Sequence, residues 1–435
     1  MTVEMAKGVR DFSPEDKILR EELISKLTNI FQRYGYSPLE TPSIERLDTL
    51  TAKFAAGTDS DAVKEIFKLT DQGNRDLGLR FDLTVPFSRF IAMNPNLKMP
   101  FKRYEIGRVF RDGPIKLGRY REFWQCDVDI AGCSSVRAEA ELILLALDAF
   151  KNLGLDAYIE VNNRKLLFGI MDYCNIPRDL RESVIISIDK IKKQGFESVK
   201  KELLEKGLTI DSIKKIIEVF QIKGTNQEII NAARQIISSE LGLEGVNELD
   251  ELFSYIGFIP SEKVIINLSL ARGLTYYTGT VFEGFLRNSK ITSSICGGGR
   301  YDSLIGLYAE NAREYPAVGI SFGLEPITDA LKMLNPEQKK TVTQLYIIPI
   351  KTFKESLIIA TKLREAGLNV DIDLMDKGVS KNLDYANSLK IPFVAFIGEN
   401  ELKEQKIKLK NMHTGKEELV NLEELFNIVE SSLGA

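Results

Sequence analysis

Two neighbouring segments with alternating side chains constrain the fold of this chain most strongly. Residues 101–111 (FKRYEIGRVFR) and 120–130 (YREFWQCDVDI) alternate in polarity and are rich in aromatic residues. The stretch that joins them, DGPIKLGR, contains glycine and proline and is typical of a turn. Alternation with a period of two residues places successive side chains on opposite faces of a strand. The sequence therefore predicts a long β-hairpin.

The rest of the chain changes character along its length. Apolar residues at helical spacing predict helices at 14–34 and 135–152. Strand signals nearly vanish after about residue 163, and short strands resume after about residue 263. The C-terminal part alternates strands with helices, which is typical of a small α/β domain with a largely parallel sheet. We expect a sheet domain in two parts (1–162 and 261–333), a mainly helical insertion (163–260), a linker (334–340) and a C-terminal α/β domain (341–435).

The composition is ordinary for a globular protein. Of 435 residues, 44% are hydrophobic and 28% are charged, and the formal net charge is -4. No run approaches ~20 apolar residues, so we expect no membrane-spanning helix. The N-terminus lacks the charged start and apolar middle of a signal peptide, which favours a cytoplasmic protein. Nucleic acid is not excluded as a partner, because a local basic groove can lie on an acidic protein.

Histidine and cysteine chemistry is nearly excluded. The single histidine, His413, lies in the turn-like stretch NMHTGKEE, and we interpret it as a solvated loop residue. The four cysteines form no CxxC pair, which argues against a zinc ribbon or a thioredoxin motif and favours free thiols. Any reaction would therefore depend on arginines, carboxylates, phenols and backbone groups.

Arginines gather around the tip of the predicted hairpin, at Arg108, Arg111, Arg119 and Arg121. Alternation places Arg119 and Arg121 on one face of the outgoing strand with Phe123 and Gln125. Guanidinium groups bind phosphate oxygens in pairs and stack on flat rings. This face is therefore suited to a nucleotide. From this segment alone, a solvated arginine face is an equally good interpretation.

Carboxylates and glycines accompany these arginines. Asp82, Asp127, Asp129 and Glu283 lie in strand-like segments, where acidic groups are costly unless they are paired or functional. A metal ion, a cationic substrate or the arginines themselves would neutralise them. The stretch GGGRYD (297–302) matches neither common phosphate-binding fingerprint, and a tight strand bend is its simpler interpretation.

The stretch LARGLTYYTGTVFEG (270–284) is strand-like but contains one arginine, two tyrosines and several glycines. Glycine within a strand marks a bulge or a close approach to the backbone. We therefore interpret the stretch as the wall of an anion site, with Arg272 as the cation and with Gly273 and Gly279 leaving room for substrate.

These segments resemble the histidyl-tRNA synthetase family, which belongs to the class II aminoacyl-tRNA synthetases. YGYSPLETPSIE resembles the first motif, with Pro42 at its signature proline. RYEIGRVFRDGPIKLGRYREFWQCDVDIAG resembles the second motif in its archaeal and eukaryotic form. LARGLTYYTGTVFEG resembles the signature of the histidine enzymes, and GGGRYD with PAVGISFGLE resembles the region of the third motif. The resemblance runs nearly from end to end.

The resemblance implies a fold and an activity. The fold would be an α+β catalytic domain with an antiparallel sheet, a helical insertion and a C-terminal α/β anticodon-binding domain, in a homodimer. The activity would attach histidine to tRNA(His) through a histidyl-adenylate, converting ATP to AMP and pyrophosphate, with Mg²⁺ bridging phosphates. By analogy, the insertion would clamp the acceptor arm of the tRNA.

The resemblance also implies roles for particular residues. Arg111 and Arg272 would be catalytic at the α-phosphate of ATP, with Arg119 and Phe123 completing the ATP site. An imidazole needs an acceptor for one ring nitrogen and a partner for the other, which Asp129 and Tyr277 would provide. The histidine site would comprise Asp82, which would hold the α-ammonium group, with Thr84, Gln125, Asp129, Arg272, Tyr276, Tyr277 and Tyr301.

Two positions depart from the family pattern. Thr275 stands where the family usually has aspartate, and Pro326 stands where the third motif has an arginine that contacts ATP. Arg300 or Arg313 would be a substitute cation for the missing arginine. The alternative function is the histidine-sensing regulatory subunit of ATP phosphoribosyltransferase. That paralogue shares the synthetase fold, does not charge tRNA and lacks the anticodon-binding domain.

Overall fold

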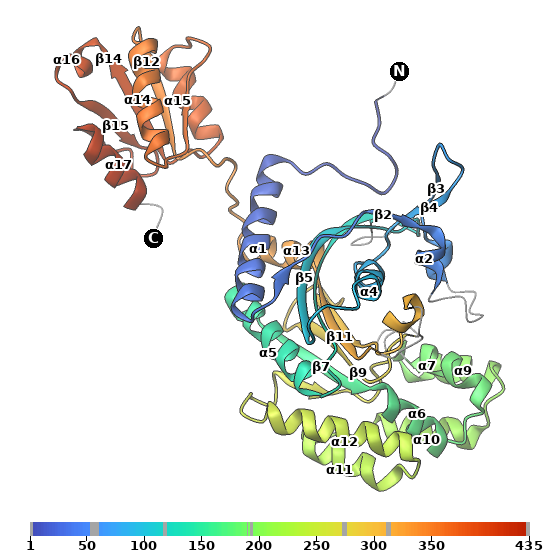
Figure 1. Cartoon of the computed structure of the whole chain (residues 1–435). Coiled ribbons are helices and arrows are strands. Elements are labelled where there is room, and N and C mark those ends of the chain that lie inside the picture. The colour runs from blue at the N-terminus through green and yellow to red at the C-terminus, as the bar shows by residue number, and fades with distance from the viewer. Residues whose placement is uncertain are drawn as a thin grey trace. The chain divides into compact units, whose positions relative to one another are not determined.

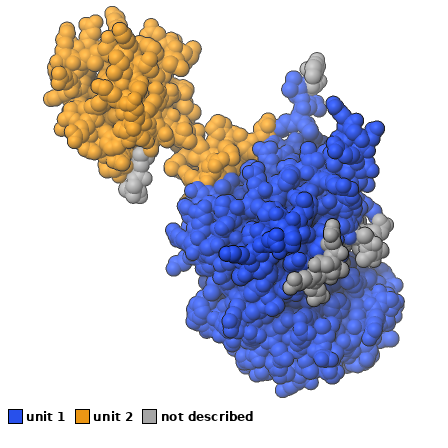
Figure 2. Space-filling model, in the orientation of Figure 1, with its two compact units in different colours: residues 1–10, 23–334 blue, residues 11–22, 335–435 orange. Residues whose placement is uncertain are grey.

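The computed structural model describes residues 3–52, 61–115, 120–188, 190–191, 195–271, 276–309 and 315–431. The chain forms two compact units, residues 1–10 with 23–334 and residues 11–22 with 335–435 (Figure 2). Each unit contains its own cluster of buried hydrophobic residues. All the site residues predicted from the sequence fall within the first unit.

An eight-stranded sheet forms the framework of the first unit (Figure 1). In spatial order its strands are β1 (Ser37–Pro38), β5 (Phe101–Phe110), β6 (Glu122–Ala131), β11 (Ala317–Gly323), β10 (Cys296–Arg300), β9 (Thr280–Leu286), β7 (Ala157–Asn163) and β8 (Val264–Ile266). The outer pairs β1–β5 and β7–β8 are parallel, and the pairs between them are antiparallel. The predicted hairpin is β5–β6, with Phe110 opposite Glu122.

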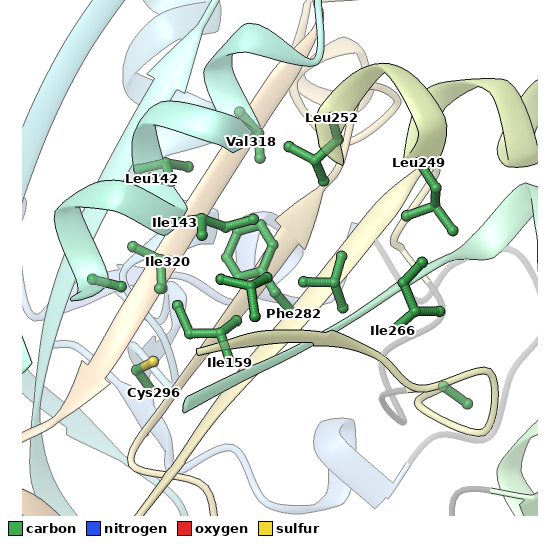
Figure 3. Packing of buried hydrophobic residues seen from close by; sticks show 14 of the residues in the cluster. Leu142, Ile143, Ile159, Leu249, Leu252, Ile266, Phe282, Cys296, Val318 and Ile320 are labelled. Carbon is green, nitrogen blue, oxygen red and sulfur yellow. The ribbon is translucent and has the colours of Figure 1, made fainter. Parts of the chain in front are cut away.

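Helices cover one face of this sheet and supply most of its core. They are α1 (Pro14–Arg33), α5 (Arg137–Asn152) and α13 (Leu324–Leu334). In Figure 3, Leu142 and Ile143 of α5 lie near Phe282 of β9 and Ile320 of β11. Burying each such side chain contributes about 1.5–3 kcal/mol to folding. Since alternate strand residues point to this core, the remaining ones face the other side of the sheet.

The predicted helical stretch after residue 163 forms α6 (Arg164–Tyr173), α7 (Arg181–Ile188), α9 (Phe196–Glu205), α10 (Ile210–Phe220), α11 (Asn226–Ile236) and α12 (Glu240–Tyr255), with a 3₁₀ turn, η2 (Arg178–Leu180). Its core is continuous with that of the sheet, since Leu249 and Leu252 of α12 belong to the same cluster (Figure 3). Helices α6 and α12 approach closely, because a Cβ on Gly169 would lie 2.6 Å from the Cα of Gly242. At the start of α11, Thr225 and Glu228 form a capping box.

The other side of the large sheet faces shorter elements. A three-stranded sheet consists of β2 (Ile44–Arg46), β4 (Asp76–Leu79) and β3 (Lys68–Thr70), and α2 (Leu47–Thr51) and α3 (Asp61–Lys64) accompany it. Helix α4 (Thr84–Met93) packs with the 3₁₀ turn η3 (Ile305–Tyr308) through Phe87, Ile91 and Ile305. Pro86 lies in the first turn of α4, where the missing N–H costs no helical hydrogen bond.

The second unit contains a five-stranded sheet, in the order β13 (Val370–Ile372), β12 (Leu345–Ile350), β14 (Phe393–Gly398), β15 (Ile407–Asn411) and β16 (Glu417–Val420). Strand β12 is parallel to both neighbours, and the last two pairings are antiparallel. The accompanying helices are α14 (Phe353–Glu365), α15 (Val379–Ser388), α16 (Glu399–Lys403) and α17 (Leu422–Ser431). His413 is exposed in the turn between β15 and β16, as expected. In the described part of the chain, no helix has the length and apolar character that crossing a membrane requires.

Three local predictions were wrong. In the stretch 270–284, strand β9 begins at Thr280, residues 276–279 belong to no strand, and 272–275 lie outside the described residues. Gly279 does not make room for substrate, because a Cβ there would lie 3.1 Å from the Cδ of Arg300. The glycines of GGGRYD form no strand bend but the regular inner strand β10, antiparallel to β9 and β11.

Candidate active site

Strand β6 directs polar side chains to the sheet face opposite the hydrophobic core. Gln125, Asp127 and Asp129 alternate with core residues of the same strand, as the period-two pattern predicts. Across the sheet, Glu105 of β5 and Ser321 of β11 both lie opposite Asp127. Asp127 and Asp129 are each 3% exposed, so this polar face is buried.

Two buried arginines neutralise part of this carboxylate cluster. Arg103 pairs with Asp129 Oδ2 at 2.8 Å and with Glu105 Oε2 at 3.3 Å. Arg80 pairs with Glu105 Oε1 at 2.9 Å, and the hydroxyl of Thr41 donates to the same oxygen at 2.8 Å. Arg80, Arg103 and Glu105 were not among the site residues predicted from the sequence. The sequence signal that could have revealed them is the pair of opposite charges, Arg103 and Glu105, two residues apart in an alternating strand.

Asp129 lies among the predicted tyrosines. The hydroxyl of Tyr301 donates to Asp129 Oδ1 at 2.6 Å. Burial, followed by the charge of Asp129, raises the pKa of Tyr301 well above its usual value, so the phenol remains a donor. Burial also raises the pKa of Asp129, against the lowering effect of Arg103. The rings of Tyr276 and Tyr277 are 4.7 Å apart between centroids, and Tyr276 meets Tyr301 edge-on at 6.3 Å.

The N-terminus of α4 brings a further carboxylate to this pocket. Asp82 is 7% exposed, and its Oδ1 accepts the backbone N–H of Val85 at 2.9 Å. The carbonyl of Thr84 accepts the hydroxyl of Ser88 at 2.8 Å within the same turn. The charge of Asp82 raises the pKa of Asp127, which shows that the two carboxyl groups lie within electrostatic range.

Three buried acceptors on β6 have no hydrogen-bond donor among the described residues, although one of them, Asp129 Oδ2, forms the ion pair with Arg103. Gln125 Nε2 donates to Ser321 Oγ at 2.9 Å, but Gln125 Oε1 accepts no hydrogen bond, and neither does Asp127 Oδ1. An unsatisfied buried acceptor costs about 1–3 kcal/mol. Burial and the charge of Asp129 raise the pKa of Asp127 to about 8, while Arg103 lowers it. The pocket is therefore suited to a ligand that donates hydrogen bonds.

An arginine and a flat ring meet at the open end of β6. Arg111 Nε donates to the carbonyl of Phe81 at 3.1 Å, and its guanidinium carbon lies 4.9 Å from the ring centroid of Phe123. A guanidinium that is held in this way is suited to a phosphate beside a stacked base. Arg119 and Arg272, which we also predicted to bind ATP, lie outside the described residues.

At the hairpin tip, Arg108 and Arg121 each pair with a neighbouring carboxylate, and Arg119 of the predicted cluster lies outside the described residues. Arg108 has a half-exposed side chain that pairs with Glu122 at 2.9 Å. It lies 5.7 Å from the ring centroid of Trp124, whose side chain alternates to the face opposite Phe123. The solvated-face interpretation therefore applies to Arg108. Arg121 pairs with Asp112 at 3.0 Å.

Arg300 is not the substitute cation that the sequence suggested. Its guanidinium forms two hydrogen bonds to Glu139 of α5, at 2.6 and 2.7 Å, and pairs with Asp302 at 3.1 Å. Because α5 covers the core face of the sheet, Arg300 points away from the site. Pro326 lies in the first turn of α13. The other suggested substitute, Arg313, lies outside the described residues.

Glycines in β10 and β11 make room for the side chains of the pocket. A Cβ on Gly319 would lie 1.8 Å from Asp129 Oδ1. A Cβ on Gly299 would lie 2.9 Å from the ring of Tyr277. Contacts below about 3.0 Å cannot be accommodated without displacement. These glycines therefore determine the positions that the carboxylate of Asp129 and the phenol of Tyr277 can occupy.

Known proteins match the chain over nearly its whole length. Residues 8–327 match the family model described as histidyl-tRNA synthetase, and residues 344–432 match an anticodon-binding domain. Histidine--tRNA ligase 1 of Bacillus anthracis is 45% identical over 432 residues, which cover 98% of this chain and 100% of that protein.

The chain belongs to the histidyl-tRNA synthetase family. The predicted class II fold, with its antiparallel sheet and C-terminal anticodon-binding domain, is thereby confirmed. The crystal structure of the histidyl-tRNA synthetase from Nostoc sp. PCC 7120 superimposes with a TM-score of 0.87 at 30% identity, covering 99% of this chain and 100% of that one.

A second solved structure shares the fold. An ATP phosphoribosyltransferase regulatory subunit/histidyl-tRNA synthetase from Bacillus halodurans C has a TM-score of 0.75 at 23% identity, covering 92% of this chain and 99% of that one. At this identity the likeness concerns the fold alone. The polar face of β6 and the contact between Arg111 and Phe123 are the features of this chain that are suited to binding histidine and a nucleotide.

Proposed function

We propose that this protein is a histidine–tRNA ligase. It activates histidine with ATP to form a histidyl-adenylate and pyrophosphate, and it then transfers the histidyl group to tRNA(His) with release of AMP. The observation that carries the proposal is the buried polar cluster over β6, which lies on the same strand as Phe123 and its partner Arg111 in a chain 45% identical over 432 residues to a histidine–tRNA ligase.

The pocket would recognise histidine at both ends. Asp129, oriented by Arg103 and Tyr301, accepts a hydrogen bond from one imidazole nitrogen, and the phenol of Tyr277 meets the other. Asp82 receives the α-ammonium group. Thr84, Gln125, Tyr276 and Tyr301 complete the walls. A pocket of this polarity rejects apolar analogues, because its buried groups would then remain unpaired.

The ATP site would lie towards Arg111. The activation step is the attack of the histidine carboxylate on the α-phosphorus, and it requires positioning and cations where negative charge develops. Arg111 and Arg272 supply those cations, Phe123 stacks on adenine, and Arg119 is assigned to the same ATP site. The carbonyl of Phe81 fixes the guanidinium of Arg111 before substrate arrives, so little reorganisation is needed during reaction.

Mg²⁺ belongs to the same proposal. Within the described ranges, no three His, Cys, Asp or Glu side chains are grouped to hold a metal ion. This fits an ion held chiefly by ATP phosphates with at most one or two carboxylates, which is usual for Mg²⁺ in phosphoryl-transfer sites. Bound Mg²⁺ would offset the phosphate charge.

The partners follow from the same assignment. Residues 344–432 would bind the anticodon of tRNA(His), and the first motif around Pro42 would form a homodimer interface in the cytoplasm. Ile44 of this motif is 51% exposed in the isolated chain, which is consistent with burial against a second copy. Sedimentation equilibrium tests the dimer, and a monomer at micromolar concentration would contradict it.

The regulatory-subunit alternative is less well supported. The match to an anticodon-binding domain gives the chain a module that a histidine sensor does not need. The likeness to the Bacillus halodurans protein extends only to the fold. Pro326 remains the feature that departs from an ATP-using site.

Histidine-dependent exchange of pyrophosphate into ATP tests the function. Purified protein should catalyse exchange with histidine and not with other amino acids. Arg111→Ala should slow it by roughly 10²-fold or more, the size expected for a group that acts in the transition state. Arg108→Ala removes an exposed arginine of the same hairpin and serves as the control. Absence of exchange at saturating substrates would refute the ligase assignment.

A further inference from the structure

The polar cluster over β6 contains more buried carboxyl groups than buried guanidinium groups among the described residues. Its buried carboxyl groups belong to Asp82, Glu105, Asp127 and Asp129, and its buried guanidinium groups belong to Arg80 and Arg103. The ion pairs of the two arginines go to Glu105 and Asp129. Asp127 forms no ion pair within the described part of the chain. A cation that binds at this cluster would therefore contact a carboxyl group that has no ion-pair partner among the described residues.

Hydrogen bonding points to the same place. Gln125 Oε1 and Asp127 Oδ1 lack donors, and the two residues stand two positions apart on the same face of β6. Ser321 fixes the amide of Gln125 by accepting from Nε2 at 2.9 Å, so that Oε1 is the atom left to accept. The carboxyl group of Asp82 lies within electrostatic range of Asp127, since its charge raises the pKa of Asp127.

We propose that Asp127 is a specificity-determining residue that, together with Gln125, receives the α-ammonium group of histidine. This inference rests on the proposed function. An ammonium group has three N–H donors and no acceptor, and Asp82, Gln125 and Asp127 present three acceptors to match them. An imidazole N–H needs a single acceptor, and Asp129 is already oriented for it by Arg103 and Tyr301.

The assignment predicts that histidine binding releases a proton. In the free protein, burial and Asp129 hold the pKa of Asp127 near 8, so the group is largely protonated at neutral pH. An ammonium group beside it favours the carboxylate and lowers that pKa. Affinity for histidine therefore rises as pH increases towards 8. The charged and titratable groups around Asp127 are Asp129 on β6, Arg103 and Glu105 on β5, and Asp82 before α4, and the hydroxyl of Ser321 on β11 also hydrogen-bonds to its carboxyl group.

Ligand analogues test the contributions of the ammonium group and the imidazole ring of histidine separately. Calorimetric titration would compare histidine, histidinol, which keeps the ammonium group, and 3-(imidazol-4-yl)propanoate, which lacks it. Asp127→Asn keeps the shape of the side chain and removes the charge. Losing one charge-assisted hydrogen bond should weaken binding of histidine and histidinol by roughly 10-fold or more. Binding of the propanoate, which has no ammonium group to pair with Asp127, should change by less than about twofold.

The matched control is Tyr277→Phe, which removes the hydroxyl assigned to the imidazole. This variant should weaken all three ligands together. Titration of histidine near pH 7 in buffers with different ionisation enthalpies then counts the protons released. The wild-type protein should release more than Asp127→Asn does.

The outcomes are distinct. Equal loss of all three ligands in Asp127→Asn, or no loss of any, would refute the role of Asp127 while leaving the ligase intact. Wild-type protein that binds no histidine would refute the proposed function itself. If the variant fails to fold, the wild-type protein still decides the question. Its affinity for histidine must rise from about pH 6 to 8 more steeply than its affinity for the propanoate, and equal slopes would contradict the proposal.

Discussion

The hydroxyl of Tyr301 donates a 2.6 Å hydrogen bond to Asp129 Oδ1, and both residues are at most 3% exposed. Tyr301→Phe removes the donor and leaves a buried carboxylate oxygen without it. We expect the free energy of unfolding to fall by about 1–3 kcal/mol. Histidine should also bind more weakly, because Asp129 would no longer be held in one orientation. Urea unfolding and calorimetry measure the two effects.

The control for this prediction is Tyr36→Phe. Tyr36 donates to Glu141 at 2.7 Å, at a helix on the core side of the sheet. Its loss should leave the affinity for histidine unchanged. Equal loss of affinity in both variants would show that Tyr301 acts through general stability.

Gly319→Ala should be severely destabilising or should abolish activation. The added Cβ would lie 1.8 Å from Asp129 Oδ1, so the carboxylate must move from its bonds to Tyr301 and Arg103. The matched control is Gly378→Ala, because a Cβ at Gly378 meets nothing within 4 Å. At that helix N-cap we expect a loss of about 1 kcal/mol or less. Thermal unfolding with pyrophosphate exchange measures both; a fully active Gly319→Ala enzyme would contradict the geometry.

Asp127→Asn should stabilise the ligand-free protein, increasingly so at higher pH. Folding raises the pKa of Asp127 from 3.8 to about 8, so the folded state binds more protons than the unfolded state between these values. The contribution of this group to stability is therefore present below about pH 4 and is lost as pH rises towards 8. Asparagine does not titrate, so the gap between variant and wild type should be larger at pH 8 than at pH 5. If urea unfolding gave the same difference in free energy of unfolding at pH 5 and at pH 8, the raised pKa of Asp127 would be contradicted.

Pro326→Arg should lower the Michaelis constant for ATP. Proline in the first turn of α13 offers neither charge nor a flat group, and Arg300 cannot compensate because it is committed to Glu139. The control is Met333→Arg, which adds the same charge at an exposed position near the other end of the helix. Initial-rate kinetics of pyrophosphate exchange measure both variants. An unchanged or higher constant in Pro326→Arg would indicate that another cation already serves ATP.

Local periodicity predicted the elements that carry the fold. The alternation in 101–111 and 120–130 gave the β5–β6 hairpin with its faces correctly divided, since pleating follows directly from sequence order. The helical spacing in 14–34 and 135–152 gave α1 and α5 within two residues at each end. These inferences needed no knowledge of which strands are neighbours.

The errors lie where distant segments meet. Gly299 lies on the strand face that is directed at Tyr277, so alternation directs the next side chain, Arg300, to the opposite face, towards α5. Its partner there, Glu139, lies 161 residues earlier in the sequence. The glycines of β10 were interpreted as a bend because their neighbours across the sheet were unknown. Arg80 and Arg103 were missed because each binds partners far away in the sequence, such as Thr41 and Asp129.

Gly299 and Gly319 also restrict how this chain could change its substrate. Any replacement of Gly319 or Gly299 adds atoms, and those atoms point at Asp129 or Tyr277. A substitution at either glycine can therefore only reduce the space around Asp129 and Tyr277 and cannot increase it. A variant that accepts a bulkier amino acid must arise by trimming side chains on the opposite wall. Selection for new substrates would therefore leave the glycines of β10 and β11 untouched.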